Sequence, residues 1–186
     1  MRRQKGENTR SVHLPPLTTH GQTPLGLPVW RNSAWGFGEC AEYADACGDS
    51  RSALAPGRVD NPTTAAFAAA VASLEGAAAP EDVSGQAFAS GMAAITAVLM
   101  TFLRAGAHIV APVPVCGGTR SLITNVLSRF GVSASFTDYG DLGRVSAEVR
   151  PSTKIIYAET LSDPTMAVSD IRGLYRIARG AGALLV

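Results

Sequence analysis

Residues 108–136 read HIVAPVPVCGGTRSLITNVLSRFGVSASF, and this stretch decides the predicted fold. The apolar run at 108–111 predicts a strand. A helix should follow, because apolar residues recur at helical spacing at Leu122, Ile123, Val126, Leu127 and Phe130. Residues 132–136 return to a strand pattern. A strand, a helix and a second strand in this order are typical of a parallel sheet.

The same alternation continues on both sides of this stretch. Residues 86–89 and 154–158 predict further strands, and the apolar run at 183–186 predicts a strand buried on both faces. Apolar stripes predict two more helices, one with Met92, Ile95, Val98, Leu99, Phe102 and Leu103, the other with Ile171, Leu174, Tyr175 and Ala178. The predicted class is therefore α/β, a mainly parallel sheet with helices on both faces.

Composition excludes several classes of protein. Among 186 residues, 46% are hydrophobic and 17% charged, which excludes a disordered polyelectrolyte. Sixteen basic and fifteen acidic residues leave a net charge of +1, so no nucleic-acid partner is expected. The longest apolar run, near 92–103, is too short to span a bilayer, and the N-terminus lacks an apolar signal core. We therefore expect a soluble cytoplasmic protein with no membrane partner, and the three cysteines fit a reducing compartment.

The sequence pattern changes near residue 60. Residues 1–60 contain five prolines and no sustained period, which predicts a loop-rich N-terminal arm. Its many apolar side chains suggest that the arm packs on another subunit. Asn61 can then cap a helix, Pro62 suits its first turn and Gly76 ends the Ala-rich run. Residues 61–186 are expected to form the first part of the α/β domain.

Ser90, Gly91 and Met92 lie where a predicted strand passes into a predicted helix. A hydroxyl and the free N–H groups of a helix N-terminus suit a phosphate. The alternative is that Ser90 only caps the helix and Gly91 only forms the turn. Local sequence leaves both interpretations open.

Further segments match one known family in order. They are GRVDNPT at 57–63, FASGMAAI at 88–95, VCGGT at 115–119, YAETLSDPT at 157–165 and GAGALLV at 180–186. With these segments the chain resembles the Cys/Met metabolism enzymes, a pyridoxal-phosphate-dependent family that includes cystathionine γ-synthase, cystathionine γ-lyase and methionine γ-lyase. The resemblance implies the fold-type I, aminotransferase-like large domain.

The resemblance also implies a cofactor site. Ser90, Gly91 and Met92 would hold the phosphate of pyridoxal 5′-phosphate. Arg58 would reach the same phosphate from a neighbouring subunit, where a guanidinium suits an oxyanion.

Three positions of this implied site depart from the family. A tyrosine two residues before the arginine is Pro56 here, the aromatic ring that stacks on the cofactor is Cys116, and the asparagine before Pro-Thr is Asp163. A thiol cannot stack as an aromatic ring does. An ionised Asp163 would repel the phenolic oxygen of the cofactor unless it is protonated or turned away.

The family's Schiff-base lysine and the aspartate that pairs with the pyridinium nitrogen have no counterpart in this sequence. Lys5 lies in a charged terminus, and Lys154 is expected at the amino end of a strand, opposite the edge where such sheets bind ligands. No catalytic residue is therefore assigned, and the chain alone should be inactive.

Three hypotheses remain open. In the first, the chain is the N-terminal half of a split lyase or transferase for sulfur amino acids. Together with a complementary C-terminal-half chain it would perform β- or γ-elimination or replacement. Alternatively, it is an inactive homologue that serves an intact paralogue as scaffold or regulator, or a fragment of a longer enzyme. The split enzyme and the scaffold both predict a hetero- or homo-oligomer.

No metal site is predicted. His13 and His20, like Cys40 and Cys47, are spaced more widely than zinc ligand pairs usually are. His108 is expected to be a polar residue at a strand entry rather than a catalytic base.

Overall fold

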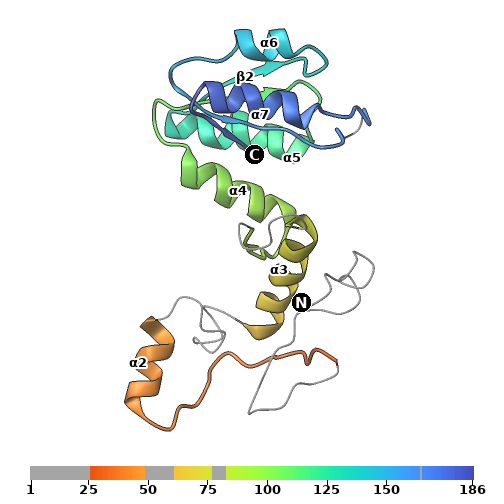
Figure 1. The fold of residues 1–186 in the computed structure, drawn as a ribbon. Coiled ribbons are helices and arrows are strands. Elements are labelled where there is room, and N and C mark those ends of the chain that lie inside the picture. Colours follow the sequence, from red (N-terminus) through yellow and green to blue (C-terminus); the bar gives the residue numbers. More distant parts are fainter. Residues whose placement is uncertain (1–25, 49–60, 77–82, 164) are drawn as a thin grey trace. The chain divides into compact units, whose positions relative to one another are not determined.

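The computed structural model describes residues 26–48, 61–76, 83–163 and 165–186. The chain divides into two compact units, Met1–Ala87 and Phe88–Val186. Figure 1 shows the helices and strands of both units.

The first unit contains the predicted Ala-rich helix, which is helix α3 (Pro62–Glu75). Asn61 is its N-cap, and the Asn61 side chain accepts a hydrogen bond from the Thr63 N–H at 2.9 Å. Gly76 is the C-cap, as the sequence predicts. This helix prediction is confirmed at both ends.

The segment before α3 contains a helix as well as the predicted irregular chain. Residues 26–39 are irregular, but helix α2 (Cys40–Gly48) follows them and was not predicted. Trp30 N–H donates to Thr63 Oγ1 at 2.9 Å, and Asn61 Nδ2 donates to the Trp30 carbonyl at 2.9 Å. These bonds join the segment to the start of α3 in the first unit. Packing of the arm on another subunit stays a prediction.

The second unit is built on a parallel sheet, as predicted. Its strands are β1 (His108–Pro112), β2 (Ser133–Thr137), β3 (Thr153–Ile156) and β4 (Leu184–Leu185). Their order is β2-β1-β3-β4, and every neighbouring pair is parallel. The carboxyl ends of β1 and β3 therefore meet at one edge, where open α/β sheets bind ligands.

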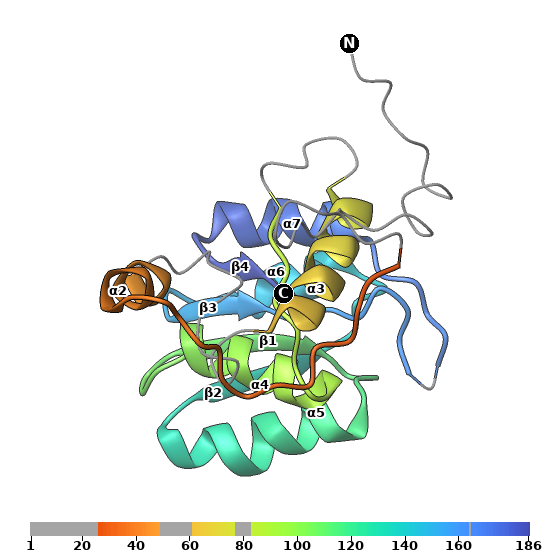
Figure 2. The same ribbon diagram turned by 90° about the horizontal axis from the view of Figure 1, so that it is seen from below.

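Helices cover both faces of this sheet. They are α4 (Gly91–Phe102), α5 (Gly117–Ser121), π-helix η2 (Leu122–Val126), 3₁₀-helix η3 (Leu127–Phe130), α6 (Leu142–Ala147) and α7 (Ile171–Gly180). Figure 2 shows α7 on one face and α5 on the other.

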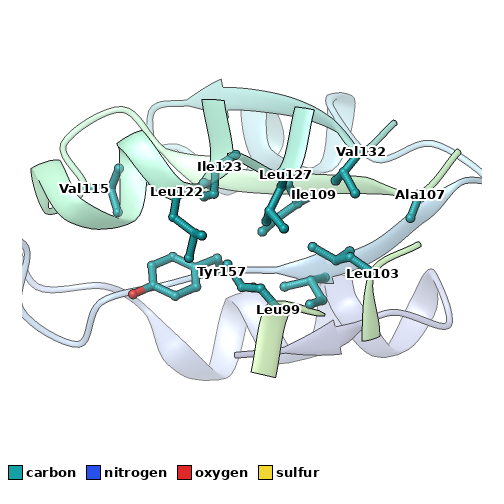
Figure 3. Close-up of a cluster of buried hydrophobic side chains, with 12 residues drawn as sticks. Leu99, Leu103, Ala107, Ile109, Val115, Leu122, Ile123, Leu127, Val132 and Tyr157 are labelled. Carbon is teal, nitrogen blue, oxygen red and sulfur yellow. The ribbon is translucent and has the colours of Figure 1, made fainter. Parts of the chain in front are cut away.

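Each face has its own hydrophobic core because side chains alternate along a strand. Ile109 of β1 packs with residues of α4, η2 and η3, whereas the next residue, Val110, packs with α6 and α7. Figure 3 shows the first of these clusters, with Leu99 and Leu127 directed toward Ile109. Burial on both faces explains why β1 appears as a continuous apolar run.

The helix predicted after β1 is present but irregular. Leu127 N–H donates to the Leu122 carbonyl, an i→i−5 bond that widens the turn, and a 3₁₀ turn follows. Leu122 and Leu127 remain buried, but Val126 is 41% and Phe130 57% exposed. The predicted apolar stripe is therefore wrong at Val126 and Phe130.

Two strand predictions need correction. Residues 86–89 form no strand, since none of the pairings among the described residues includes them and a strand needs a hydrogen-bonded neighbour. At 183–186 only Leu184 and Leu185 are in a strand. That strand, β4, pairs with β3 alone and leaves Leu184 44% exposed, so it is not buried on both faces.

Within the described ranges, none of the helices is both long enough and apolar enough to cross a membrane.

Candidate functional site

The N-terminus of α4 is open. Ser90 is its N-cap: Ala93 N–H donates to Ser90 Oγ at 3.1 Å, and Ala94 N–H donates to the Ser90 carbonyl at 3.1 Å. The amides of Gly91 and Met92 precede these bonds and belong to the groups that a helix cannot satisfy by itself. A Cβ added at Gly91 would meet no atom within 4 Å. The predicted capping role of Ser90 is confirmed, and open space for an anion remains beside it.

A second helix N-terminus lies next to the first. Cys116 is the N-cap of α5, and its side chain makes no capping bond. A Cβ added at Gly118 would lie 2.8 Å from Met92 Sδ, so the starts of α4 and α5 are in contact. The absence of a side chain at Gly118 thus allows the two helix N-termini to approach each other.

The loop after β3 completes this edge of the sheet. Glu159 accepts two backbone hydrogen bonds, from Cys116 N–H to Oε1 at 3.0 Å and from Asp163 N–H to Oε2 at 3.2 Å. The buried Ser162 hydroxyl donates to the Pro114 carbonyl at 2.8 Å. Side chains of the β3 loop therefore hold the loop that follows β1.

Tyr157 lies buried beneath these loops. Burial raises the pKa of its hydroxyl, the neighbouring Thr119 hydroxyl lowers it, and the charges of Glu159 and Cys116 raise it. The net shift is upward, so Tyr157 stays protonated at neutral pH. Its ring belongs to the hydrophobic core beneath the site.

Five of the predicted site residues therefore lie in the second unit, near the carboxyl ends of β1 and β3. They are Ser90, Gly91, Met92, Cys116 and Asp163. The prediction for Arg58, and the departure at Pro56, lie outside the described residues. Glu159 was missed: it stands inside the YAETLSDPT motif, but no residue pattern shows that its carboxylate binds the Asp163 amide of that motif and also the distant Cys116 amide.

The residues present fit the phosphate of pyridoxal 5′-phosphate better than its ring. Gly91 leaves open space in front of free helix amides, a suitable setting for an oxyanion. For the ring, Cys116 offers no aromatic face, and Asp163 is exposed with its N–H already bound to Glu159. Lys154 is exposed on β3 next to Thr153, which pairs with the first residue of β1. It is therefore at the opposite end of the sheet, as predicted.

That opposite end holds His108, which is fully buried. Its Nδ1 lies 2.8 Å from Thr153 Oγ1 and its Nε2 lies 3.1 Å from Ser135 Oγ. Burial lowers the His108 pKa, as does the charge of Arg150, while Glu148 raises it. The imidazole thus links β1, β2 and β3, which agrees with the predicted strand-entry role.

Among the residues that the structure describes, no three His, Cys, Asp or Glu side chains form a group that could hold a metal ion. His13 and His20 lie outside those residues.

Comparison with known proteins supports the fold and the family resemblance. The family described as Cys/Met metabolism PLP-dependent enzyme matches residues 8–186. Cystathionine beta-lyase MetC of Bacillus subtilis is 35% identical over 176 residues, which are 95% of this chain and 42% of MetC. Cystathionine gamma-lyase of the same organism is 43% identical over 129 residues, 69% of this chain and 32% of that enzyme.

Solved structures show the same fold. A structure assigned to an O-acetylhomoserine (thiol)-lyase (metY) of Campylobacter jejuni, which contains a pyridoxyl-lysine monophosphate, has a TM-score of 0.85 at 26% identity. The match covers 97% of this chain and 43% of the Campylobacter jejuni chain. MetB of Corynebacterium glutamicum has a TM-score of 0.82 at 30% identity, with coverages of 97% and 44%. The predicted fold-type I architecture is confirmed, and the chain spans less than half the length of these relatives.

Proposed function

The chain belongs to the Cys/Met metabolism PLP-dependent enzyme family, and from this membership we propose that it supplies the phosphate-binding part of a lyase or transferase acting on sulfur-containing amino acids. Pyridoxal phosphate is the cofactor expected of this family. The substrate class follows from relatives such as MetC and cystathionine gamma-lyase, which are named for cystathionine.

One observation carries the proposal. The N-terminus of α4 is open at Gly91, and it contacts the start of α5 at the carboxyl edge of a parallel sheet. Ser90 Oγ and the amides of Gly91 and Met92 are oriented by the helix, so they can bind an oxyanion without rearrangement. Arg58 would add a charge-assisted contact to the same phosphate.

We propose that the Schiff-base lysine comes from polypeptide outside these 186 residues. Lys154 is exposed at the far end of the sheet and cannot approach Ser90 within the folded unit. The Schiff-base lysine would be supplied by a complementary chain in a hetero-oligomer or, if these residues are a fragment of a longer enzyme, by the remainder of the same polypeptide. When bound there, the cofactor would accept the electron pair released as the amino-acid Cα loses its proton. This chain would anchor the phosphate.

A second candidate is favoured by Cys116 and Asp163. Neither side chain provides the ring contact of the family, and the Asp163 N–H is bound to Glu159. A chain with these changes could serve an intact paralogue as scaffold or regulator without binding cofactor itself.

Isolation of the full chain with its partners tests the proposal. Mass analysis of the complex should find a chain that contains the missing lysine region, and the complex should absorb in the visible range with pyridoxal phosphate. Borohydride should fix the pyridoxyl group on the partner and not on Lys154. A stoichiometric adduct on Lys154 would refute the assignment of the lysine. If the chain instead co-purifies with an intact paralogue, and that paralogue binds the same amount of cofactor with and without this chain, the scaffold would be favoured.

Substitution of Arg58 separates the two candidates. If this chain binds the phosphate, Arg58→Ala should weaken cofactor affinity of the complex about tenfold to a hundredfold, because one charge-assisted hydrogen bond is lost. Arg58→Lys should recover part of the loss, since an ammonium cannot form the two-pronged contact of a guanidinium. Unchanged affinity in both variants would contradict the phosphate-binding role.

A further inference from the structure

Among the described residues, Glu159 is the carboxylate that accepts backbone hydrogen bonds from two loops at the ligand edge of the sheet. Its Oε1 accepts from Cys116 N–H at 3.0 Å, across 43 residues of sequence. Its Oε2 accepts from Asp163 N–H at 3.2 Å. The two oxygens of one side chain thus set the positions of the two residues that the family resemblance places beside the cofactor ring.

Other bonds hold Glu159 itself in place. The Ser169 hydroxyl donates to the Glu159 carbonyl at 2.7 Å, and the Ser162 hydroxyl ties the same loop to the Pro114 carbonyl at 2.8 Å. Glu159 follows Ala158, whose N–H donates to the Val186 carbonyl at 2.8 Å at the end of β3. The carboxylate therefore extends from a fixed backbone and not from a free loop.

We propose that Glu159 is a positioning residue, which rests on the proposed function: its carboxylate locks Cys116 and Asp163 into a single arrangement at the end of the site where the ring of the cofactor would lie. A carboxylate suits this role because both of its oxygens accept hydrogen bonds. A glutamine of the same shape has one accepting oxygen and one donating amide, so it can satisfy only one of the two N–H groups. The locking acts on the ring end of the site, and the phosphate end at Ser90 does not depend on it.

The first test measures the lock itself in the full chain. Glu159→Gln should raise amide hydrogen exchange about tenfold to a hundredfold at either Cys116 or Asp163, and Glu159→Ala should raise it at both, because a hydrogen bond to a charged group is lost. Glu75→Gln, at the end of α3 in the other unit, is the matched control and should change neither amide.

A measurement on the wild-type chain covers the case in which a variant does not fold. As the pH is lowered, the Cys116 amide proton shift should change with the same midpoint as the side-chain carboxyl carbon of Glu159. Separate midpoints would overturn the inference, as would unchanged exchange in folded Glu159→Gln and Glu159→Ala.

The second test distinguishes positioning from mere structural support. Pyridoxine 5′-phosphate carries the ring and phosphate of the cofactor without its aldehyde, and inorganic phosphate carries no ring. Glu159→Gln should weaken binding of pyridoxine 5′-phosphate about tenfold and leave the affinity for inorganic phosphate unchanged, as followed by the amide shifts of Gly91 and Met92. Equal effects on both ligands would reduce Glu159 to a structural residue.

The two proposals fail in different ways. If neither ligand shifts the Gly91 and Met92 amides of the wild-type chain, the proposed function fails and the positioning role fails with it. If both ligands bind and Glu159→Gln changes neither exchange nor the preference for the ring-bearing ligand, positioning is overturned while the phosphate site stands.

Discussion

Lowering the pH from about 7.5 to about 5.5 should destabilise the second unit through His108. The imidazole is 0% exposed and lies between Thr153 Oγ1 and Ser135 Oγ. Arg150 donates to the same Ser135 hydroxyl at 3.0 Å, so a second positive charge on His108 would face an existing one. Protonation would also leave the ring with two donors, and it could no longer accept at either nitrogen.

The sign and size of the effect follow from linkage. The His108 pKa is lowered from its ordinary value of 6.5 in the folded protein, first by burial and then by Arg150, against the opposing charge of Glu148. Below about pH 6.5 the unfolded chain binds a proton that the folded chain does not, so stability is present above that pH and is lost as the pH falls. One such proton changes the free energy of unfolding by at most about 1.4 kcal/mol per pH unit. We expect a decrease of about 1 kcal/mol across the range.

Urea unfolding followed by circular dichroism at several pH values measures this decrease. The matched variant is His108→Gln, which retains one donor and one acceptor but does not titrate. Its unfolding free energy should be lower than that of the wild type at about pH 7.5, and it should depend less on pH. An equal pH dependence in both proteins would show that His108 is not the group responsible.

Four further substitutions test the capping and packing of the second unit. Ser90→Ala should lower stability by about 1 kcal/mol in urea unfolding, because the α4 N-cap bond is lost. Leu174→Ala, fully buried between α7 and the sheet, should cost about 2 to 5 kcal/mol, whereas Leu184→Ala at 44% exposure should cost less than half as much. Gly173→Ala should lower the thermal midpoint despite its better helix propensity, because the new methyl group would lie 2.6 Å from Asp170 Oδ2 and displace the carboxylate that caps α7; a higher midpoint would contradict this.

Much of the sheet was predictable because its central strands, β1 and β3, are mostly buried. The run at 108–111 and the strand beginning at Lys154 correspond to β1 and β3, and their apolar residues supply both cores. Capping chemistry also fixed the start of α3, since Asn61 followed by proline satisfies the first amides in one conformation only. At these places the local sequence pattern and the tertiary contacts favour the same conformation.

Other features depend on contacts that no local pattern records. Helix α2 is short, and its sequence CAEYADACG contains no large aliphatic side chain that would mark a stripe. Whether residues 86–89 form a strand depends on a hydrogen-bonded neighbour rather than on their own composition. Within the candidate site, the motifs indicated Ser90, Cys116 and Asp163, but the role of Glu159 arises from bonds between loops separated by 43 residues.

The widened turn at η2 has a consequence for how this domain can vary. A turn closed by an i→i−5 bond contains one residue more than an α-helical turn, and that residue occupies the solvent side, where Thr124 and Asn125 are exposed. The buried leucines on either side, Leu122 and Leu127, keep their places against the sheet. A homologue could therefore omit a single residue here and keep the same core, so that an alignment gap inside a helix would mark a change of winding and not a loss of structure.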